Sequence, residues 1–226
     1  MKKIQIEIVQ TGMGKTIGQD YAISTNNLAV VLDGCGSGEH SEVGAHKMGE
    51  RLRKKSKKIN EGNFEDIAYT SFYEIVMEDD SEERIISELQ FTLIACLETG
   101  NEFIVYSAGD GFIITVDKSN MINYIQLDND VNVANGEAPK YLAYNYIPNR
   151  QRYSTKVTFS KKNFAKDQYK FVYVASDGLR FVLGDKFPSE DKELFKKALT
   201  DRSQSEIKTI LRRNQTLILD DISIAS

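Results

Sequence analysis

Apolar and polar residues change their period along the chain, which divides it into strand-like and helix-like segments. Residues 4–10 and 20–25 alternate between apolar and polar positions, and residues 28–33 form a short apolar run. These three segments are typical of strands joined by polar turns. After Ser41, a predicted N-cap, apolar residues recur every three or four positions, which predicts a helix to about Lys58.

Residues 64–76 keep the helical period throughout, and a shorter helix capped by Ser81 is predicted through Leu89. From Phe91 to Leu127 four apolar runs are separated by the turn-like sequences ETGN, GDG and DKSN. Separators of this kind favour hairpins, so we predict a meander of antiparallel strands.

The remainder of the chain repeats this succession of strands, helices and a strand. Residues 128–150 are polar and aromatic, and we predict a long surface loop or flap there. Further strands are predicted at 156–160, 170–176 and 216–226, with helices at 190–200 and 203–214. Because helices are segregated from antiparallel strands, the fold class is α+β, and no linker divides residues 1–226 into more than one domain.

Composition excludes several classes of protein. Of 226 residues, 41% are hydrophobic and 27% charged, which is typical of a globular protein and not of a disordered or membrane-spanning chain. The net charge of −4 argues against a general nucleic-acid binder, and the basic run 51–58 is read as the solvated end of a helix. Cys35 and Cys96 lack the spacing of a disulfide framework. We expect a cytoplasmic protein.

Carboxylates follow several of the predicted strands. Asp33, Asp110 and Asp177 each precede a glycine directly after an apolar run, and Asp220 and Asp221 stand side by side in an apolar segment. Each Asp-Gly pair alone is more typical of a turn than of a functional site. For Asp110, which lies between two predicted strands, we predict a turn. Adjacent acids in a strand repel unless a cation compensates them, and such oxygen ligands suit Mg²⁺ or Mn²⁺.

Five segments carry a resemblance to a known family. DGCGSGEHSEVGA, QFTLIACL, SAGDGFIITV, VASDGL and LILDDISIAS occur in the order and approximate spacing of the metal-dependent serine/threonine protein phosphatases of type 2C. The resemblance implies a four-layer α-β-β-α sandwich of two antiparallel sheets flanked by helices. It also implies two Mn²⁺ or Mg²⁺ ions and hydrolysis of phosphoserine and phosphothreonine in proteins, opposing a Ser/Thr kinase.

The resemblance implies a role for five metal-site residues. Asp33 would bridge both metals and the carbonyl oxygen of Gly34 would bind one of them. Asp177 and Asp220 would bind the other, and Asp20 would hold metal-bound water. Asp33, Asp177 and Asp220 are therefore the expected catalytic residues, since two bridged cations lower the pKa of the water that attacks phosphorus.

The sequence departs from the family pattern at several positions. Lys15 stands where the family has its substrate-phosphate arginine, and lysine lacks the planar fork that holds two phosphate oxygens. Cys35 replaces a histidine, and Asp221 replaces the usual asparagine. The acid of a further metal site would fall near Ser87, with only Glu88 close by, so the resemblance does not extend to a third metal.

Two alternatives to an active phosphatase stay open. The glycines of GCGSG could form a nucleotide-binding turn, but their spacing does not match the dinucleotide fingerprint. The departures at Lys15, Cys35 and Ser87 are compatible with a catalytically weak or inactive regulatory domain that binds metal or a partner. Retention of Asp33, Asp177 and Asp220 favours the enzyme.

Overall fold

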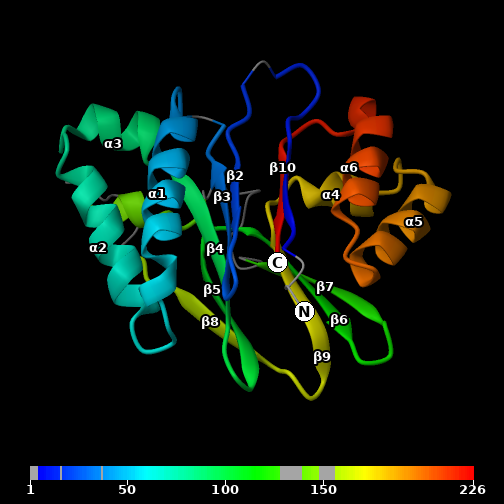
Figure 1. The fold of residues 1–226 in the computed structure, drawn as a ribbon. Coiled ribbons are helices and arrows are strands. Elements are labelled where there is room, and N and C mark those ends of the chain that lie inside the picture. The colour runs from blue at the N-terminus through cyan, green and yellow to red at the C-terminus, as the bar shows by residue number, and fades with distance from the viewer. Residues whose placement is uncertain (1–4, 16, 37, 128–138, 148–155) are drawn as a thin grey trace.

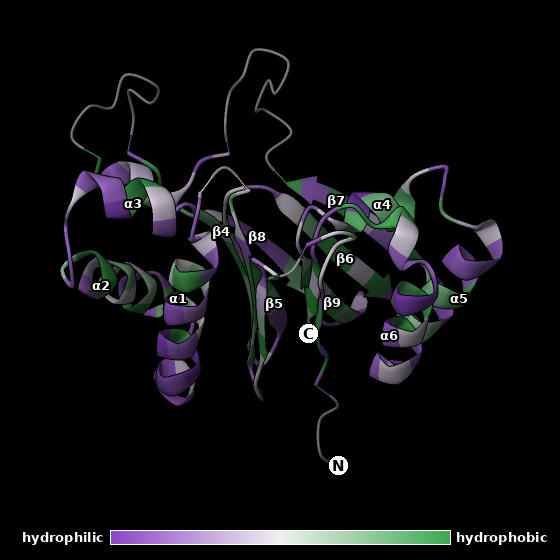
Figure 2. Cartoon of the chain, turned by 90° about the horizontal axis from the view of Figure 1, so that it is seen from above, coloured by the Kyte–Doolittle hydropathy of each residue, from purple (hydrophilic) through white to green (hydrophobic). Residues whose placement is uncertain are grey.

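The fold has four layers in the order helices, sheet, sheet, helices. The computed structural model describes residues 5–15, 17–36, 38–127, 139–147 and 156–226. In Figure 1 the two sheets stand in the middle, with α1, α2 and α3 on one side and α4, α5 and α6 on the other, and Figure 2 shows the same order from above. This arrangement confirms the predicted α+β sandwich.

Each sheet has five strands among the described residues, and every neighbouring pair is antiparallel. The first sheet runs in the order β1 (Glu7–Gln10), β10 (Ile222–Ala225), β9 (Tyr169–Ala175), β6 (Gly111–Asp117) and β7 (Ile122–Leu127). The second sheet runs in the order β2 (Tyr21–Ser24), β3 (Leu28–Gly34), β4 (Phe91–Glu98), β5 (Glu102–Ala108) and β8 (Ser160–Ala165). The two ends of the chain therefore pair in one sheet, through β1 and β10.

Three apolar clusters fill the spaces between the layers. Val31, Ile94 and Val174 belong to the cluster between the two sheets. A second cluster packs the outer face of the β2–β8 sheet against α1–α3, and a third packs the other sheet against α4–α6. Strands such as β4, with seven of eight residues buried, are apolar on both faces because each face meets another layer.

Most predicted helices are present, with small differences at their ends. The helices are α1 (Ser41–Lys55), α2 (Phe64–Val76), α3 (Glu82–Glu88), α4 (Leu179–Leu183), α5 (Ser189–Thr200) and α6 (Gln204–Arg213), with short 3₁₀ turns at Ser56–Lys58, Leu142–Asn145 and Gln215–Leu217. The prediction of Ser41 as N-cap is wrong. His40 is the cap residue, and the Ser41 hydroxyl donates instead to the carbonyl oxygen of Cys35 at 3.0 Å.

The predicted meander is wrong at its centre. β4 pairs with β5 and β6 pairs with β7, but β5 and β6 lie in different sheets. The chain crosses between the sheets at Gly109–Gly111, where Gly111 has φ +135°, and a Cβ there would lie 2.6 Å from the carbonyl oxygen of Ala175. Asp110 therefore occupies a crossover between sheets, and not the tight hairpin that we expected.

Two strand predictions require correction. The strand expected at 156–160 is displaced to Ser160–Ala165, an edge strand of which only Phe164 is buried, so its polar sequence carries little strand signal. The expected strand 216–226 is strand only over Ile222–Ala225. Asp220 and Asp221 precede the strand and do not lie within it.

The described part of the predicted flap is not confined to the surface. Tyr141, Leu142 and Ala143 are buried in the cluster beneath α1 and α2, and the Tyr146 ring lies 5.6 Å from that of Phe72. The rest of the predicted loop, 128–138 and 148–150, lies outside the described residues. Within the residues that are described, no helix combines the length and the apolar character that crossing a bilayer requires.

Candidate metal centre

Carboxylates from both sheets come together at one edge of the sandwich. Asp20 directly precedes β2, and Asp33 lies at the end of β3. Because Tyr21 pairs with Leu32 across these antiparallel strands, Asp20 and Asp33 are cross-strand neighbours. Asp177 follows the end of β9 and Asp220 precedes β10, which is antiparallel to β9. Antiparallel pairing thus places an outgoing and an incoming strand end at this edge of each sheet.

Asp20 is a buried acid of this group. Only 3% of its surface is exposed, and neither of its carboxylate oxygens has a hydrogen-bond partner. Burial raises its pKa to about 7, the nearby side chains of Asp33, Ser223 and Ser176 act against this rise, and the negative charge of Asp221 adds to it. A buried carboxylate without a partner is costly. A bound cation, reached directly or through water, would supply the missing interaction.

The neighbouring acids disfavour one another's ionisation. Removal from water raises the pKa of Asp33 well above its ordinary value, and the charges of Asp20, Asp177 and Asp110 raise it further. Burial also raises the pKa of Asp177, although the positive charge of Arg180 acts against the rise. Negative charge is therefore concentrated here beyond what the protein's own cations offset.

Asp110 is a residue that our sequence reasoning assigned only to a turn. Its charge acts on Asp33 because the crossover from β5 to β6 brings it to the same edge. The missed signal is the additional glycine before Asp110, Gly109, since glycines on both sides are more than a two-residue hairpin needs.

Asp221 fixes the loop that carries the early site residues. It is 1% exposed, and its two oxygens accept hydrogen bonds from the backbone N–H groups of Gly12 at 2.8 Å and Gln19 at 2.5 Å. These bonds attach the segment between β1 and β2, which includes Lys15, to the start of β10. Asp221 therefore positions the residues of this loop.

Two cations are paired with the acids. Lys15 Nζ lies 2.6 Å from Asp220 Oδ1 and 3.6 Å from Asp221 Oδ2. Arg180, in the first turn of α4, places Nη1 2.5 Å from Asp177 Oδ2 and Nη2 3.3 Å from Asp220 Oδ2. Among the described residues, no three acidic, cysteine or histidine side chains form a ready-made ion cage.

The donor set nevertheless fits divalent cations of the Mg²⁺ and Mn²⁺ type. The carboxylates are hard oxygen donors, and Asp20 offers two buried oxygens without protein partners. Gly34, the last residue of β3, pairs with Phe91 and so keeps its backbone at the same strand end as Asp33. Asp33, Gly34, Asp177 and Asp220 are the residues that would hold the ions.

The other sequence candidates lie at the margin of this centre. Cys35 is half-buried and its carbonyl oxygen accepts the Ser41 hydroxyl. His40 faces Glu42, and the ring of His46 packs 4.3 Å from that of Tyr21. His40 therefore lies at the N-cap of α1, and His46 lies within the helix.

The position expected for a third-metal acid is occupied by structural contacts. The Ser87 carbonyl oxygen accepts a hydrogen bond from the N–H of His40 at 3.1 Å, which joins α3 to the start of α1. Glu88 is ion-paired with Arg84, at 3.0 Å between Oε2 and Nε.

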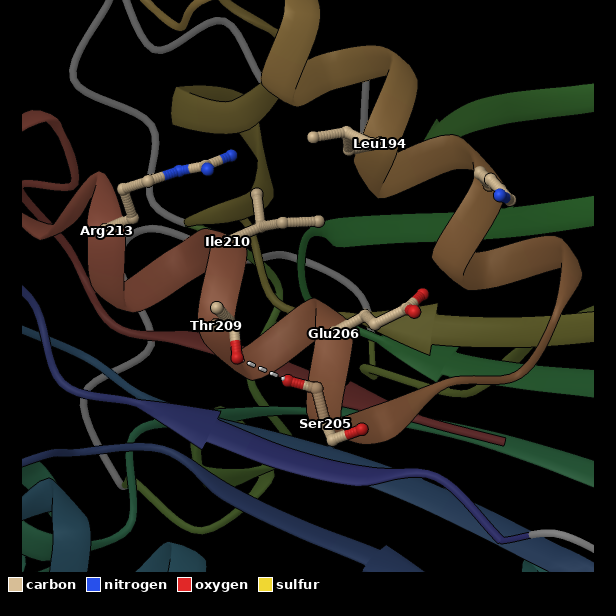
Figure 3. A pocket seen from close by; sticks show the side chains of 7 residues that line it. Leu194, Ser205, Glu206, Thr209, Ile210 and Arg213 are labelled. Atoms are coloured by element: carbon tan, nitrogen blue, oxygen red, sulfur yellow. Dashed lines mark hydrogen bonds between the residues drawn. The ribbon is translucent and has the colours of Figure 1, made fainter.

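A separate hollow of about 300 Å³ lies between α5 and α6 in the outer helical layer (Figure 3). It is lined by Leu194, Ile210 and polar residues that include Lys197 and Arg213, and Glu206 is the acid among its lining residues. A single carboxylate beside two cations does not suit a pair of metals.

Solved structures share this architecture at low sequence identity. The Staphylococcus aureus serine/threonine phosphatase Stp1 is 15% identical with a TM-score of 0.65, covering 98% of this chain and 92% of its own. PppA of Pseudomonas aeruginosa is 15% identical with a TM-score of 0.69, covering 98% and 95%. The catalytic domain of the phosphatase PstP, solved with two manganese ions, is 14% identical with a TM-score of 0.64, covering 98% and 95%. These likenesses establish the fold.

Sequence comparison identifies the family. No curated protein sequence matches the chain significantly. The family model described as Protein phosphatase 2C matches residues 15–214, a segment that includes Lys15, Asp20, Asp33 and Asp177 and ends before Asp220. A match over most of the chain, together with the sandwich and the acids at its edge, shows that the chain belongs to the protein phosphatase 2C family.

Proposed function

We propose that residues 1–226 form a single catalytic domain that hydrolyses phosphoserine and phosphothreonine in proteins with two Mn²⁺ or Mg²⁺ ions. The observation that carries this proposal is the pair of buried, unpartnered oxygens of Asp20 beside Asp33, at the edge where Asp177 and Asp220 also lie. A scaffold with no need for cations would gain stability by replacing such acids.

Within this proposal each group of residues has a distinct task. Asp33, Gly34, Asp177 and Asp220 hold the ions, and Asp20 contributes through water. Bound divalent cations supply Lewis acidity and make water a nucleophile near neutral pH. Lys15 supplies positive charge for the substrate phosphate, and Asp221 keeps the loop of Lys15 and Asp20 in place through its hydrogen bonds to Gly12 and Gln19.

Metal-dependent turnover tests the proposal. We expect the wild-type protein to cleave an aryl phosphate and a phosphothreonine peptide with Mn²⁺ and not with EDTA. Asp177→Asn is expected to lower kcat by about two orders of magnitude or more, because a ligand charge is lost. Asp167→Asn is the matched control, since Asp167 is exposed in the turn before β9, at the opposite end of that strand. Equal loss in both variants would contradict the assignment.

The second candidate is a regulatory domain that binds metal or a partner without catalysis. The ion pairs of Lys15 with Asp220 and of Arg180 with Asp177 favour it, because they offset the charge of these two acids without a metal. Mn²⁺ binding by calorimetry without turnover on either substrate would support this alternative and reject the enzyme.

The partners follow from the reaction. A phosphoprotein would be the substrate, and a Ser/Thr kinase of the same compartment would supply it, since hydrolysis of a phosphate ester requires its prior formation. We propose a cytoplasmic site of action, where protein phosphorylation by such kinases takes place. Phosphopeptide preference, measured with Mn²⁺ on matched serine, threonine and tyrosine peptides, tests the residue class directly.

A further inference from the structure

Arg180 is paired with two of the carboxylates that the proposed function assigns to metal binding. Its guanidinium spans Asp177 and Asp220, with one nitrogen on Oδ2 of each carboxylate. Lys15 Nζ holds the other oxygen of Asp220. Both carboxylate oxygens of Asp220 are thus paired with side-chain cations of the protein.

A divalent cation that binds these carboxylates competes with the guanidinium. Both are positive, and both approach Oδ2 of Asp177 and of Asp220. The Arg180 side chain is 53% exposed, whereas Asp177 is 21% exposed, so the arginine can leave toward solvent without disrupting the core. Its backbone remains in place, because the N–H of Arg180 donates to the Asp177 carbonyl oxygen at 3.0 Å.

After displacement, the backbone of Arg180 would stay beside Asp177, and its guanidinium group would be available to bind another anion. Lysine at position 15 lacks that fork, and Lys15 is itself held by Asp220 and by Gln19 at 3.3 Å. A phosphate dianion matches guanidinium geometry through two parallel hydrogen bonds. The missing bidentate group could therefore be supplied from α4 instead of from the loop before β2.

We propose that Arg180 is an exchangeable counterion that divalent metal displaces from Asp177 and Asp220, after which its guanidinium binds the phosphate of the substrate. The inference rests on the proposed function and assigns a substrate-binding role to a residue outside the expected set. Metal entry and phosphate binding would then be coupled through one side chain.

Metal affinity tests the first half. Isothermal titration calorimetry with Mn²⁺ is expected to show about three- to tenfold tighter binding in Arg180→Ala than in wild type, since a competing half-exposed ion pair is removed. Arg51→Ala is the matched control, because Arg51 also spans two carboxylates, Glu74 at 2.6 Å and Glu78 at 2.7 Å, on the outer face of α1 and α2. Unchanged or weaker Mn²⁺ binding in Arg180→Ala overturns the proposal.

Phosphate affinity tests the second half. Inorganic phosphate is expected to bind the Mn²⁺-loaded Arg180→Ala protein about tenfold more weakly than loaded wild type, because a charge-assisted hydrogen bond is lost. Arg180→Lys, which keeps the charge without the fork and guards against a folding artefact, is expected to recover only part of the affinity. Equal phosphate binding in wild type and Arg180→Ala overturns the proposal.

These readouts separate the inference from the proposed function. Wild-type protein that binds no Mn²⁺ would reject both. Mn²⁺ and phosphate binding that respond to Arg180→Ala, without turnover of an aryl phosphate, would support the counterion and reject the enzyme. Turnover of an aryl phosphate, with Mn²⁺ and phosphate affinities that Arg180→Ala does not change, would support the enzyme and reject the counterion.

Discussion

At the scale of single residues, the centre depends on how each acid is compensated. Asp221 is compensated by two backbone N–H groups, whereas Asp20 has two buried oxygens and no partner. Both acids are almost fully buried. The difference explains why Asp221 can serve as a structural anchor while Asp20 depends on protonation or on a cation.

This difference makes the metal-free protein sensitive to pH. Folding raises the pKa of Asp20 from 3.8 to about 7, chiefly through burial. The folded protein therefore binds the Asp20 carboxyl proton more tightly than the unfolded chain does. Stability contributed by the protonated form is therefore lost as pH rises from about 4 to about 7. Urea unfolding in EDTA measures the free energy of unfolding at pH 5.5 and at pH 7.5. We expect the difference between these two values to be about 1–3 kcal/mol smaller in Asp20→Asn than in wild type.

Asp167→Asn should show the same difference in unfolding free energy between pH 5.5 and 7.5 as wild type, since Asp167 is exposed. A difference of wild-type size in Asp20→Asn would show that another group carries the pH dependence. Asp33 and Asp177 are the next to test, because burial raises the pKa of both in the same direction.

At the scale of elements, the start of α4 and the start of β10 are packed without space between them. A Cβ on Gly178 would lie 1.9 Å from the carbonyl oxygen of Asp221, so only glycine permits this approach. The contact sets the separation between the two acids that flank it, Asp177 and Asp220.

Gly178→Ala should therefore damage the centre as well as the fold. We expect a loss of about 2–4 kcal/mol in unfolding free energy from overpacking against backbone, together with weaker Mn²⁺ binding. Chemical denaturation and calorimetry measure the two effects. Gly100→Ala, in a turn where an added Cβ meets nothing within 4 Å, is the control. Full Mn²⁺ affinity in Gly178→Ala would mean that this approach does not position the acids.

Local patterns predicted most elements but not how they pair. The helical period of 64–76 and the apolar run of β3 were sufficient to place those elements, because each buries a face of fixed period. The edge strand β8 was misplaced and the crossover at Asp110 was missed, because long-range packing determines both. Arg180 was missed for the same reason, since its pairing with Asp220 spans 40 positions.

At the scale of the whole molecule, the centre joins the two sheets. Asp20 and Asp33 come from the sheet of β2 and β3, whereas Asp177 and Asp220 come from the sheet of β9 and β10. Apolar packing already holds the sheets together across most of their area through residues such as Val31 and Val174. At the acidic edge, however, the raised pKa values show that the facing groups disfavour one another until a cation or a proton intervenes.

Divalent metal should therefore stabilise the sandwich as a whole. At a free Mn²⁺ concentration 100 times the Kd, binding to the native state alone contributes about 2.7 kcal/mol, or roughly 5–10 °C in Tm for a chain of this size. Hydrogen exchange should show added protection in strand ends of both sheets, near Asp33 and near Asp220, because ligands from both are tied to the same ions. Asp177→Asn should reduce the Tm shift and Asp167→Asn should retain it. Protection confined to one sheet would mean that the ions bind without bridging the layers, and the four acids would then not form one centre.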